Sequence, residues 1–362
     1  METAGWVPEP KCGRGTLSVV WACLPTITFV LWTAIHLDAS RSMGRGMWGL
    51  FVFFVPEAMP AIALDQLIKA RRLRKRLRAL VGWESWTLKQ SFLVVKRGVR
   101  GLGGGETLTP WRLVELAEQQ QYMVAHGSSG IRMGMLPSGD AIDRRSKKSW
   151  FEKLLAGLQA LWFCANIVSR LASGYTVTPL EDMTIAYTCC GLIASIAWWH
   201  CPQDIEEPFE VDLDAAGDAM FAAVECGYSI SQHSDTDSSR SSSSSGSSSP
   251  VTGSDGLMMG IVCVLLGLLA AIHIAEWDYA FPSAAEAWIW RCCSIATLPI
   301  GLLIVFYGDR CRSTHWSMSW TGPGYVVVRL ALLTVAATSF RRMPVSVFDS
   351  PDWSDYWAHV GK

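Results

Sequence analysis

Long apolar runs separated by polar segments constrain this chain of 362 residues more than any other feature. A helix needs about 20 mostly apolar residues to cross the hydrocarbon core of a bilayer. Because lipid offers no hydrogen bonds, the run must satisfy its own backbone groups, and a helix does so. The sequence therefore predicts an all-α, polytopic transmembrane helix bundle with six or seven membrane-spanning helices. The predicted spans are residues 17–37, 47–64, 154–171, 183–201, 257–275, 287–307 and, as the shortest, 325–340.

Composition agrees with a membrane protein and speaks against several other classes. Charged residues make up 17% of the chain, whereas an ordinary soluble domain carries about a quarter. The 18 tryptophans gather near the ends of the apolar runs, which is typical of aromatic belts at membrane–water interfaces. A net charge of −1 gives no indication of nucleic-acid binding. No C-x-x-C pair occurs, which speaks against a zinc site, and no defined metal-ligand motif leads to a predicted metal site.

The polar segments divide the chain into further parts. The segment after the second span is basic and has amphipathic stretches, whereas the segment after the fourth is acidic and then Ser-rich. A Ser-rich segment cannot bury a core, so it is predicted to be disordered. The predicted parts are an N-terminal segment (1–16), helices 1–2 (17–64), a basic cytoplasmic loop (65–153), helices 3–4 (154–201), the acidic and Ser-rich linker (202–255), helices 5–7 (256–340) and a C-terminal tail (341–362).

The distribution of Lys and Arg predicts the orientation, because these residues favour the cytoplasmic side of a membrane. The densest basic run, residues 69–78, follows the second predicted span. The 65–153 segment and the N-terminus are therefore both predicted to be cytoplasmic, with the connections at 38–46, 173–182 and 276–286 on the other side. The basic helix is either a lipid-regulated docking element or an ordinary juxtamembrane anchor. The predicted location is the endomembrane system or the plasma membrane.

Glu57 is the sharpest candidate for a functional side chain. It lies inside the second predicted span, between Pro56 and Pro60, where the missing N–H of a proline frees nearby carbonyls. A desolvated carboxyl there would suit a general acid or a proton carrier. The alternative is a structural carboxyl that is protonated or paired with Arg329, Arg291 or a tryptophan N–H.

Two histidines, His36 and His273, lie within apolar runs rather than beyond them. Imidazoles suit proton transfer, so both join the glutamate as catalytic candidates. Trp277, Arg291 and Arg329 are candidates for binding a ligand, because a guanidinium in a membrane segment could hold an anionic headgroup or a diphosphate. The competing interpretation is that these helix ends meet water and that the arginines extend toward the interface.

Acidic residues gather at the helix ends that are predicted to face the lumen or exterior. If these segments lie close together around one opening at that end of the bundle, histidines and carboxylates there could transfer protons or bind a metal. The simpler interpretation is solvation of helix ends, and it suits most of these residues better. They are Asp38, Glu181, Asp182, Glu276, Asp278 and Glu286.

Several strings occur in an order that resembles a large group of uncharacterised fungal multi-pass membrane proteins. They are Cys-Gly-Arg-Gly-Thr at 12–16, Pro-Glu at 56–57, Leu-Trp-Phe at 161–163, Trp-Trp at 198–199, and His273 with Trp277, Phe281-Pro282 and Trp290-Arg291. The likeness spans most of the chain except the basic loop and the Ser-rich linker. The resemblance implies an architecture and no activity, and it makes Glu57, His273, Trp277 and Arg291 motif positions.

Two classes of function follow from these features. The first is a membrane protein of unknown activity that binds a lipid or another apolar ligand in its helical core, as a receptor, scaffold or transporter-like module. The second is a membrane-embedded enzyme, resembling a terpenoid cyclase, in which Glu57 protonates an alkene or epoxide and tryptophan rings stabilise the cation. Convergence of Glu57, His36 and His273 on one enclosed apolar cavity would favour an enzyme or ligand site. Membrane lipids are the predicted partners, no cofactor motif is present, and the oligomeric state is left open.

Overall fold

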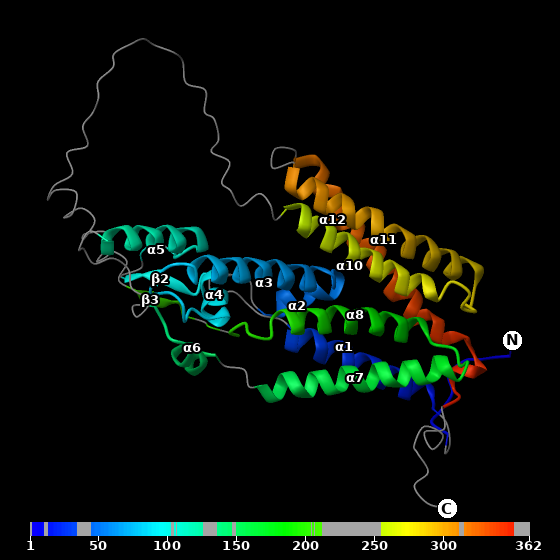
Figure 1. Cartoon of the computed structure of the whole chain (residues 1–362). Coiled ribbons are helices and arrows are strands. Elements are labelled where there is room, and N and C mark those ends of the chain that lie inside the picture. The colour runs from blue at the N-terminus through cyan, green and yellow to red at the C-terminus, as the bar shows by residue number, and fades with distance from the viewer. Residues whose placement is uncertain are drawn as a thin grey trace, which may run out of the picture.

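Long helices packed side by side form one bundle, with a small domain at one end of it (Figure 1). The computed structural model describes residues 2–10, 14–34, 45–102, 105, 107–125, 136–146, 150–203, 205, 207–211, 255–310 and 315–350. His36, Asp38 and the Ser-rich part of the linker lie outside these residues, so the predictions made for them are not addressed by the fold.

The described residues form eleven α-helices and four short strands. Strand β1 (Thr3–Ala4) pairs antiparallel with β4 (Met343–Pro344), and β2 (Val99–Gly101) pairs parallel with β3 (Phe209–Val211). The helices are α1 (Thr16–Ala34), α2 (Arg45–Phe54), α3 (Ala58–Leu77), α4 (Leu88–Val95), α5 (Pro110–Ala125), α6 (Gly139–Arg145), α7 (Trp150–Ala172), α8 (Pro179–Ala197), α10 (Asp255–Ala275), α11 (Ala284–Arg310) and α12 (His315–Thr338).

Five of these helices are long and apolar enough to cross a membrane, namely α7, α8, α10, α11 and α12. Counting the bent pair of α2 and α3 as one span would make six, and α1 has a shorter apolar stretch, Thr16–Trp32. The fold is mostly helical, which confirms the predicted helical class, and it contains several candidate membrane spans. Large apolar side chains on the outside of the bundle, such as Trp21 and Trp162, fit a surface that faces lipid.

The predicted span over 47–64 consists of two helices rather than one continuous helix. The helix stops at Phe54, the axis bends by 108°, and α3 begins at Ala58. Pro56 explains the break, because proline has no N–H to donate and restricts the residue before it. Helix α3 then continues past residue 64 to Leu77, so the basic helix is the second half of α3 and not a separate element.

Helix α1 runs in the same direction as α8. At the start of both helices, Arg14 donates to both carboxylate oxygens of Glu181. Further along, Val30 packs on Gly191 so closely that a Cβ added to this glycine would lie 2.0 Å from Val30 Cγ1. Small residues allow this close approach of two helix backbones.

Helix α3 also advances along α8 in that direction. Met59 lies beside Gly191, and seven residues later Gln66 Oε1 accepts a hydrogen bond of 2.9 Å from Nε1 of Trp198, just past the end of α8. The α2–α3 pair therefore enters the bundle and leaves it at the end where α1 finishes. We call this end, from which the basic half of α3 projects, the basic end.

The opposite end, which we call the terminal end, holds both termini of the described chain. Strands β1 and β4 pair there, and Arg14 Nε donates to the carbonyl of Val347. The α7–α8 and α10–α11 connections lie at the same end (Figure 1). The N-terminus and the basic half of α3 therefore lie at opposite ends of the bundle, whereas the sequence predicted that both face the cytoplasm.

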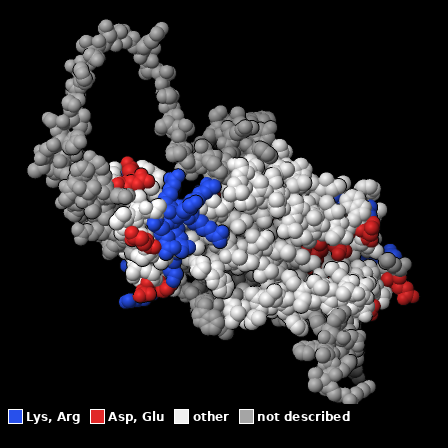
Figure 2. All heavy atoms as spheres, viewed as in Figure 1, with Lys and Arg blue, Asp and Glu red and all other residues white. Residues whose placement is uncertain are grey.

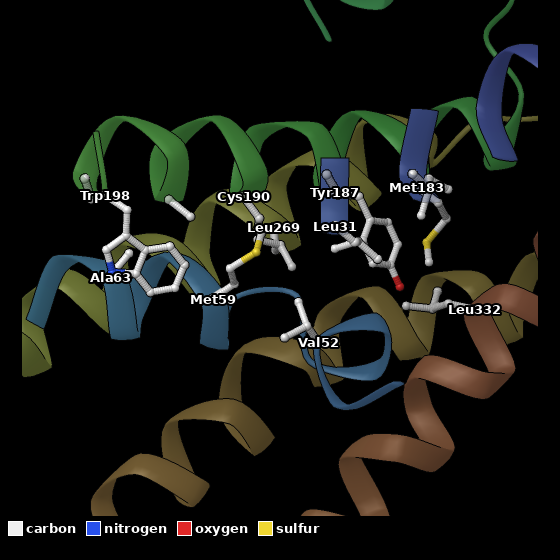
Figure 3. Close-up of a cluster of buried hydrophobic side chains, with 14 of the residues drawn as sticks. Leu31, Val52, Met59, Ala63, Met183, Tyr187, Cys190, Trp198, Leu269 and Leu332 are labelled. Carbon is white, nitrogen blue, oxygen red and sulfur yellow. The ribbon is translucent and has the colours of Figure 1, made fainter. Parts of the chain in front are cut away.

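The main core lies where α8 faces α2, α3, α10 and α12. Figure 3 shows Tyr187 of α8 pointing toward Val52 of α2 and Leu332 of α12, with Met59 and Leu269 close by. The hydroxyl of Tyr187 donates to the carbonyl of Phe53 at the end of α2. Tyr187 thus satisfies a backbone acceptor that the break leaves without a helical partner.

The segment predicted to be a basic loop contains a small domain with a core of its own. The second half of α3, α4, α5, α6 and the β2–β3 pair surround Trp83 and Trp86, which are both buried. Trp86 Nε1 donates to Ser91 Oγ at 2.8 Å. Helix α3 contributes to both cores and so fixes this domain against the bundle.

Gly191→Val should destabilise the protein by about 1–3 kcal/mol, because the added methyl groups overlap Val30 and force α1 away from α8. Unfolding by heat or denaturant in detergent measures the change. Gly267→Val in α10 is the matched control, because no atom lies within 4 Å of a Cβ added there. Equal stability of the two variants would contradict the close α1–α8 contact.

Candidate functional site

Four buried side chains form one continuous chain of polar contacts through the core. Arg329 Nη2 lies 3.0 Å from Glu57 Oε2, and Arg329 Nη1 lies 3.0 Å from His273 Nε2. On the other side of the imidazole, His273 Nδ1 lies 2.7 Å from Asp182 Oδ2. The chain connects the α2–α3 break with α12, α10 and α8.

The contacts define the protonation of His273. A guanidinium only donates hydrogen bonds, so the ring nitrogen that faces Arg329 must be an acceptor. The proton is then on Nδ1 and is donated to Asp182, which leaves the imidazole neutral. A second proton on the ring would place an N–H against the guanidinium and break the contact.

Local sequence explains where the two ends of this chain lie. Asp182 sits in the first turn of α8, where Thr178 and Glu181 form a capping box and Pro179 starts the helix. A helix N-terminus favours carboxylates. Glu57 immediately precedes α3 at the break caused by the proline at position 56, which places its carboxyl inside the bundle rather than along a continuous helix.

Two aromatic residues contact His273 and Arg329 in the middle of this chain of polar contacts. Trp290 Nε1 donates to the carbonyl of His273 at 3.0 Å, and its ring meets the imidazole edge-on. The Arg329 guanidinium carbon lies 5.6 Å from the ring centre of Tyr325, one turn earlier on α12. Arg329 Nε has no hydrogen-bond partner among the described residues. The Arg329 guanidinium is therefore paired through both Nη atoms, and its Nε–H remains a buried donor without a partner among these residues.

The structure brings Glu57, His273 and Arg329 together and places Trp277 and Arg291 elsewhere. Arg291 donates from Nε and Nη2 to the carbonyl of Trp277, at 3.1 and 2.9 Å, and its guanidinium carbon lies 5.1 Å from the Trp277 ring centre. This pair links α11 to the residues that follow α10, so both side chains stabilise the α10–α11 connection. The fold does not address His36.

Asp182 belongs to the buried chain, but the sequence favoured solvation for it, as for most of the acidic residues at helix ends. Its neighbour Glu181 is buried too and binds Arg14. Pattern alone cannot separate a solvated from a buried first turn, because both favour carboxylates. Within the described residues, no group of three or more His, Cys, Asp or Glu side chains could hold a metal ion.

A groove of about 670 Å³ opens between α1 and α7 on the outside of the bundle. Its walls are mainly apolar and include Trp21, Pro25, Phe29 and Trp162, whereas Arg14, Arg170 and Glu181 lie at the terminal end.

Arg170 of the groove forms its hydrogen bonds with backbone carbonyls. Its Nη1 and Nη2 donate to the carbonyls of Thr176, Ser346, Val347 and Asp349, which ties the C-terminal segment to α7. Its Nε has no hydrogen-bond partner in the described part of the chain. The groove thus combines an apolar wall with a buried, incompletely bonded guanidinium.

Glu276 lies at the terminal end, just past the last residue of α10. Burial, with the nearby carboxylates of Asp182 and Glu181, raises its pKa from 4.5 to about 8. The pKa of Tyr279 is raised as well, chiefly by burial. A carboxyl beside other carboxylates is easier to keep protonated, so Glu276 limits the negative charge at this end.

Residues 1–243 match a family of unknown function, DUF8562. The chain belongs to this family. The matched region includes Glu57, Asp182 and all lining residues of the groove except Ser350, whereas His273 and Arg329 lie beyond it. It also includes the basic segment, which the resemblance found in the sequence had left out. No curated protein and no solved structure matches the chain.

Removing one partner of the buried ion pair should be costly. Glu57→Gln and Arg329→Gln should each lower the free energy of unfolding by about 3–5 kcal/mol, because each leaves an uncompensated buried charge. The double variant should lose less than the sum of the two, as a double-mutant cycle in detergent would measure. Glu115→Gln, which breaks an exposed pair with Arg112, is the control and should change stability by at most about 1 kcal/mol. Additive losses would contradict a direct Glu57–Arg329 contact.

Glu276 should make stability depend on pH. Its folded pKa of about 8 exceeds the value of about 4.3 in an unfolded chain, so the folded state binds more protons between these values. Stability should therefore fall as pH rises through this range. Glu276→Gln should flatten this fall in a series of melting curves, whereas the exposed control Asp278→Asn should retain it. An unchanged slope in Glu276→Gln would show that its carboxyl ionises normally.

Proposed function

We propose that this chain is a multi-pass membrane protein that binds one membrane lipid in the groove between α1 and α7. The observation that carries the proposal is the combination in that groove of a mainly apolar wall and the buried Arg170, whose Nε lacks a partner in the described residues. An acyl chain would lie along the wall, and an acceptor oxygen of the headgroup would meet Arg170.

The placement in the membrane follows from the direction of each helix. Helices α1, α7, α8, α10, α11 and α12 each run between the two ends of the bundle, so we take them as the spans. Helix α1 has 19 residues and is about 28 Å long at 1.5 Å per residue, close to the hydrocarbon thickness. The α2–α3 pair is then re-entrant. The positive-inside rule places the basic end in the cytoplasm and both termini on the other side.

Lipid binding in the groove replaces binding in the helical core as the favoured hypothesis. Glu57 and His273 both contact Arg329 in the core, and the guanidinium occupies the space between them. Arg329 Nη2 donates to Glu57 Oε2, so this carboxyl oxygen is already engaged by a partner within the protein. The geometry therefore supports the cyclase-like alternative less well. The fungal origin, the motif order of the resemblance and the identity of the membrane stay predictions.

A receptor role is the second candidate. Glu181 lines the groove and Asp182, the next residue of α8, belongs to the buried chain. A lipid that altered the contact between Arg14 and Glu181 would act next to Asp182 and His273, whose contacts depend on a single proton. The buried chain would then serve as the two-state element that a receptor needs.

Native mass spectrometry of the protein purified in mild detergent tests the groove. Ala22→Trp should fill the groove and lower the occupancy of a co-purified lipid about tenfold or more. Leu24→Trp is the matched control, because Leu24 is exposed on the same helix but does not line the groove. Wild type and this control should retain the lipid, and equal bulk phospholipid in all three would contradict the proposal.

The same experiment separates the two candidate functions. Glu57 lies outside the groove lining. If Glu57→Gln keeps the lipid, the groove is a plain binding site. If folded Glu57→Gln loses the lipid, the buried chain and the groove are coupled, which is the receptor interpretation.

A further inference from the structure

The basic half of α3 exposes a dense set of positive charges. Seven Lys and Arg residues occur between positions 69 and 78. All are exposed except Arg74, which is partly buried and has an Nε without a partner among the described residues. We call this set the α3 basic surface, and its members are Lys69, Arg71, Arg72, Arg74, Lys75, Arg76 and Arg78.

Little of this charge is neutralised within the protein. Lys69 pairs with Asp65 one turn earlier, at 2.6 Å. Arg78 Nε donates to the backbone carbonyl of Glu84, which contributes no full charge. For the other five residues, no ion pair with a carboxylate occurs in the described part of the chain. Charges this close together repel one another and are stabilised by an external anion.

The membrane placement proposed above puts this surface at the depth of lipid headgroups. The Gln66–Trp198 hydrogen bond places α3 level with the end of α8, so positions 69 and 75 lie about 5 and 14 Å further along the helix axis. The headgroup layer on each side of a bilayer is roughly 5–8 Å thick. Long Lys and Arg side chains can reach back over a few ångströms, so most of the surface can contact that layer.

Figure 2 shows the charge as one large basic area between the small domain and the bundle. On the bundle side, it borders directly on uncharged surface, and the acidic groups in this view lie on the small domain and at the terminal end. A charged area beside an apolar, lipid-facing surface matches the headgroup of a lipid whose chains lie against the bundle.

We propose that the α3 basic surface binds anionic phospholipid headgroups of the cytoplasmic leaflet. The proposal uses the membrane placement given above but not the α1–α7 groove, which lies elsewhere on the bundle. Several anionic headgroups sit within reach, and each neighbouring Lys or Arg contributes to a shared attraction that salt weakens.

A lipid titration followed by native mass spectrometry tests this surface. The probe is phosphatidylserine, with phosphatidylcholine as the uncharged comparison. The variant Arg71→Gln/Arg72→Gln/Lys75→Gln should weaken phosphatidylserine binding about a hundredfold, because each of the three removed charges contributes about 1 kcal/mol. The control Arg97→Gln/Arg112→Gln/Arg144→Gln removes the same charge from exposed positions outside α3 and should bind as wild type.

Further variants separate folding, charge and the groove. Arg71→Lys/Arg72→Lys retains the charge and should bind as wild type. Ala22→Trp, which fills the groove, should keep phosphatidylserine binding, so failure of one site is distinguishable from failure of the other. Equal binding of phosphatidylserine and phosphatidylcholine, equal loss in both triple variants, or displacement by an equal concentration of inorganic phosphate would each overturn the proposal.

Discussion

The pairing of Arg329 inside the bundle is the interaction on which most of the structure depends. A guanidinium cannot lose its charge, so a buried guanidinium requires hydrogen-bond acceptors and an opposite charge nearby. Glu57 and His273 meet this requirement directly, and Asp182 does so through the imidazole. Because these residues come from different helices, a single charge holds α12, α10, α8 and the α2–α3 break in one arrangement.

The break at Pro56 then has two consequences that reach opposite parts of the molecule. Toward the core, it turns Glu57 into the bundle, where Arg329 lies. Toward the basic end, it redirects the chain along α8, so that α3 leaves the bundle there and joins the small domain around Trp83 and Trp86. The same local feature thus sets the ion pair and the direction of α3.

Lipid recognition is the function that this arrangement supports best, with one proposed site toward each end of the bundle. The groove beside Arg170 suits a single lipid held by its chain and headgroup, and the α3 basic surface suits several anionic headgroups. The family, which has no assigned function, includes both regions within residues 1–243. A protein with these two sites would sense or organise the lipid around it.

Sequence by itself determined the helical class, the candidate membrane spans and the choice of Glu57, His273 and Arg329 as residues within apolar runs, because long apolar runs and charges within them have few physical explanations. It even offered Arg329 among the partners of Glu57. Only the tertiary structure decided that partner, the burial of Asp182, the bend between α2 and α3 and the end of the bundle at which the N-terminus lies. These depend on contacts between segments far apart in sequence, and a local pattern of residues carries no information about which distant helix supplies the opposite charge.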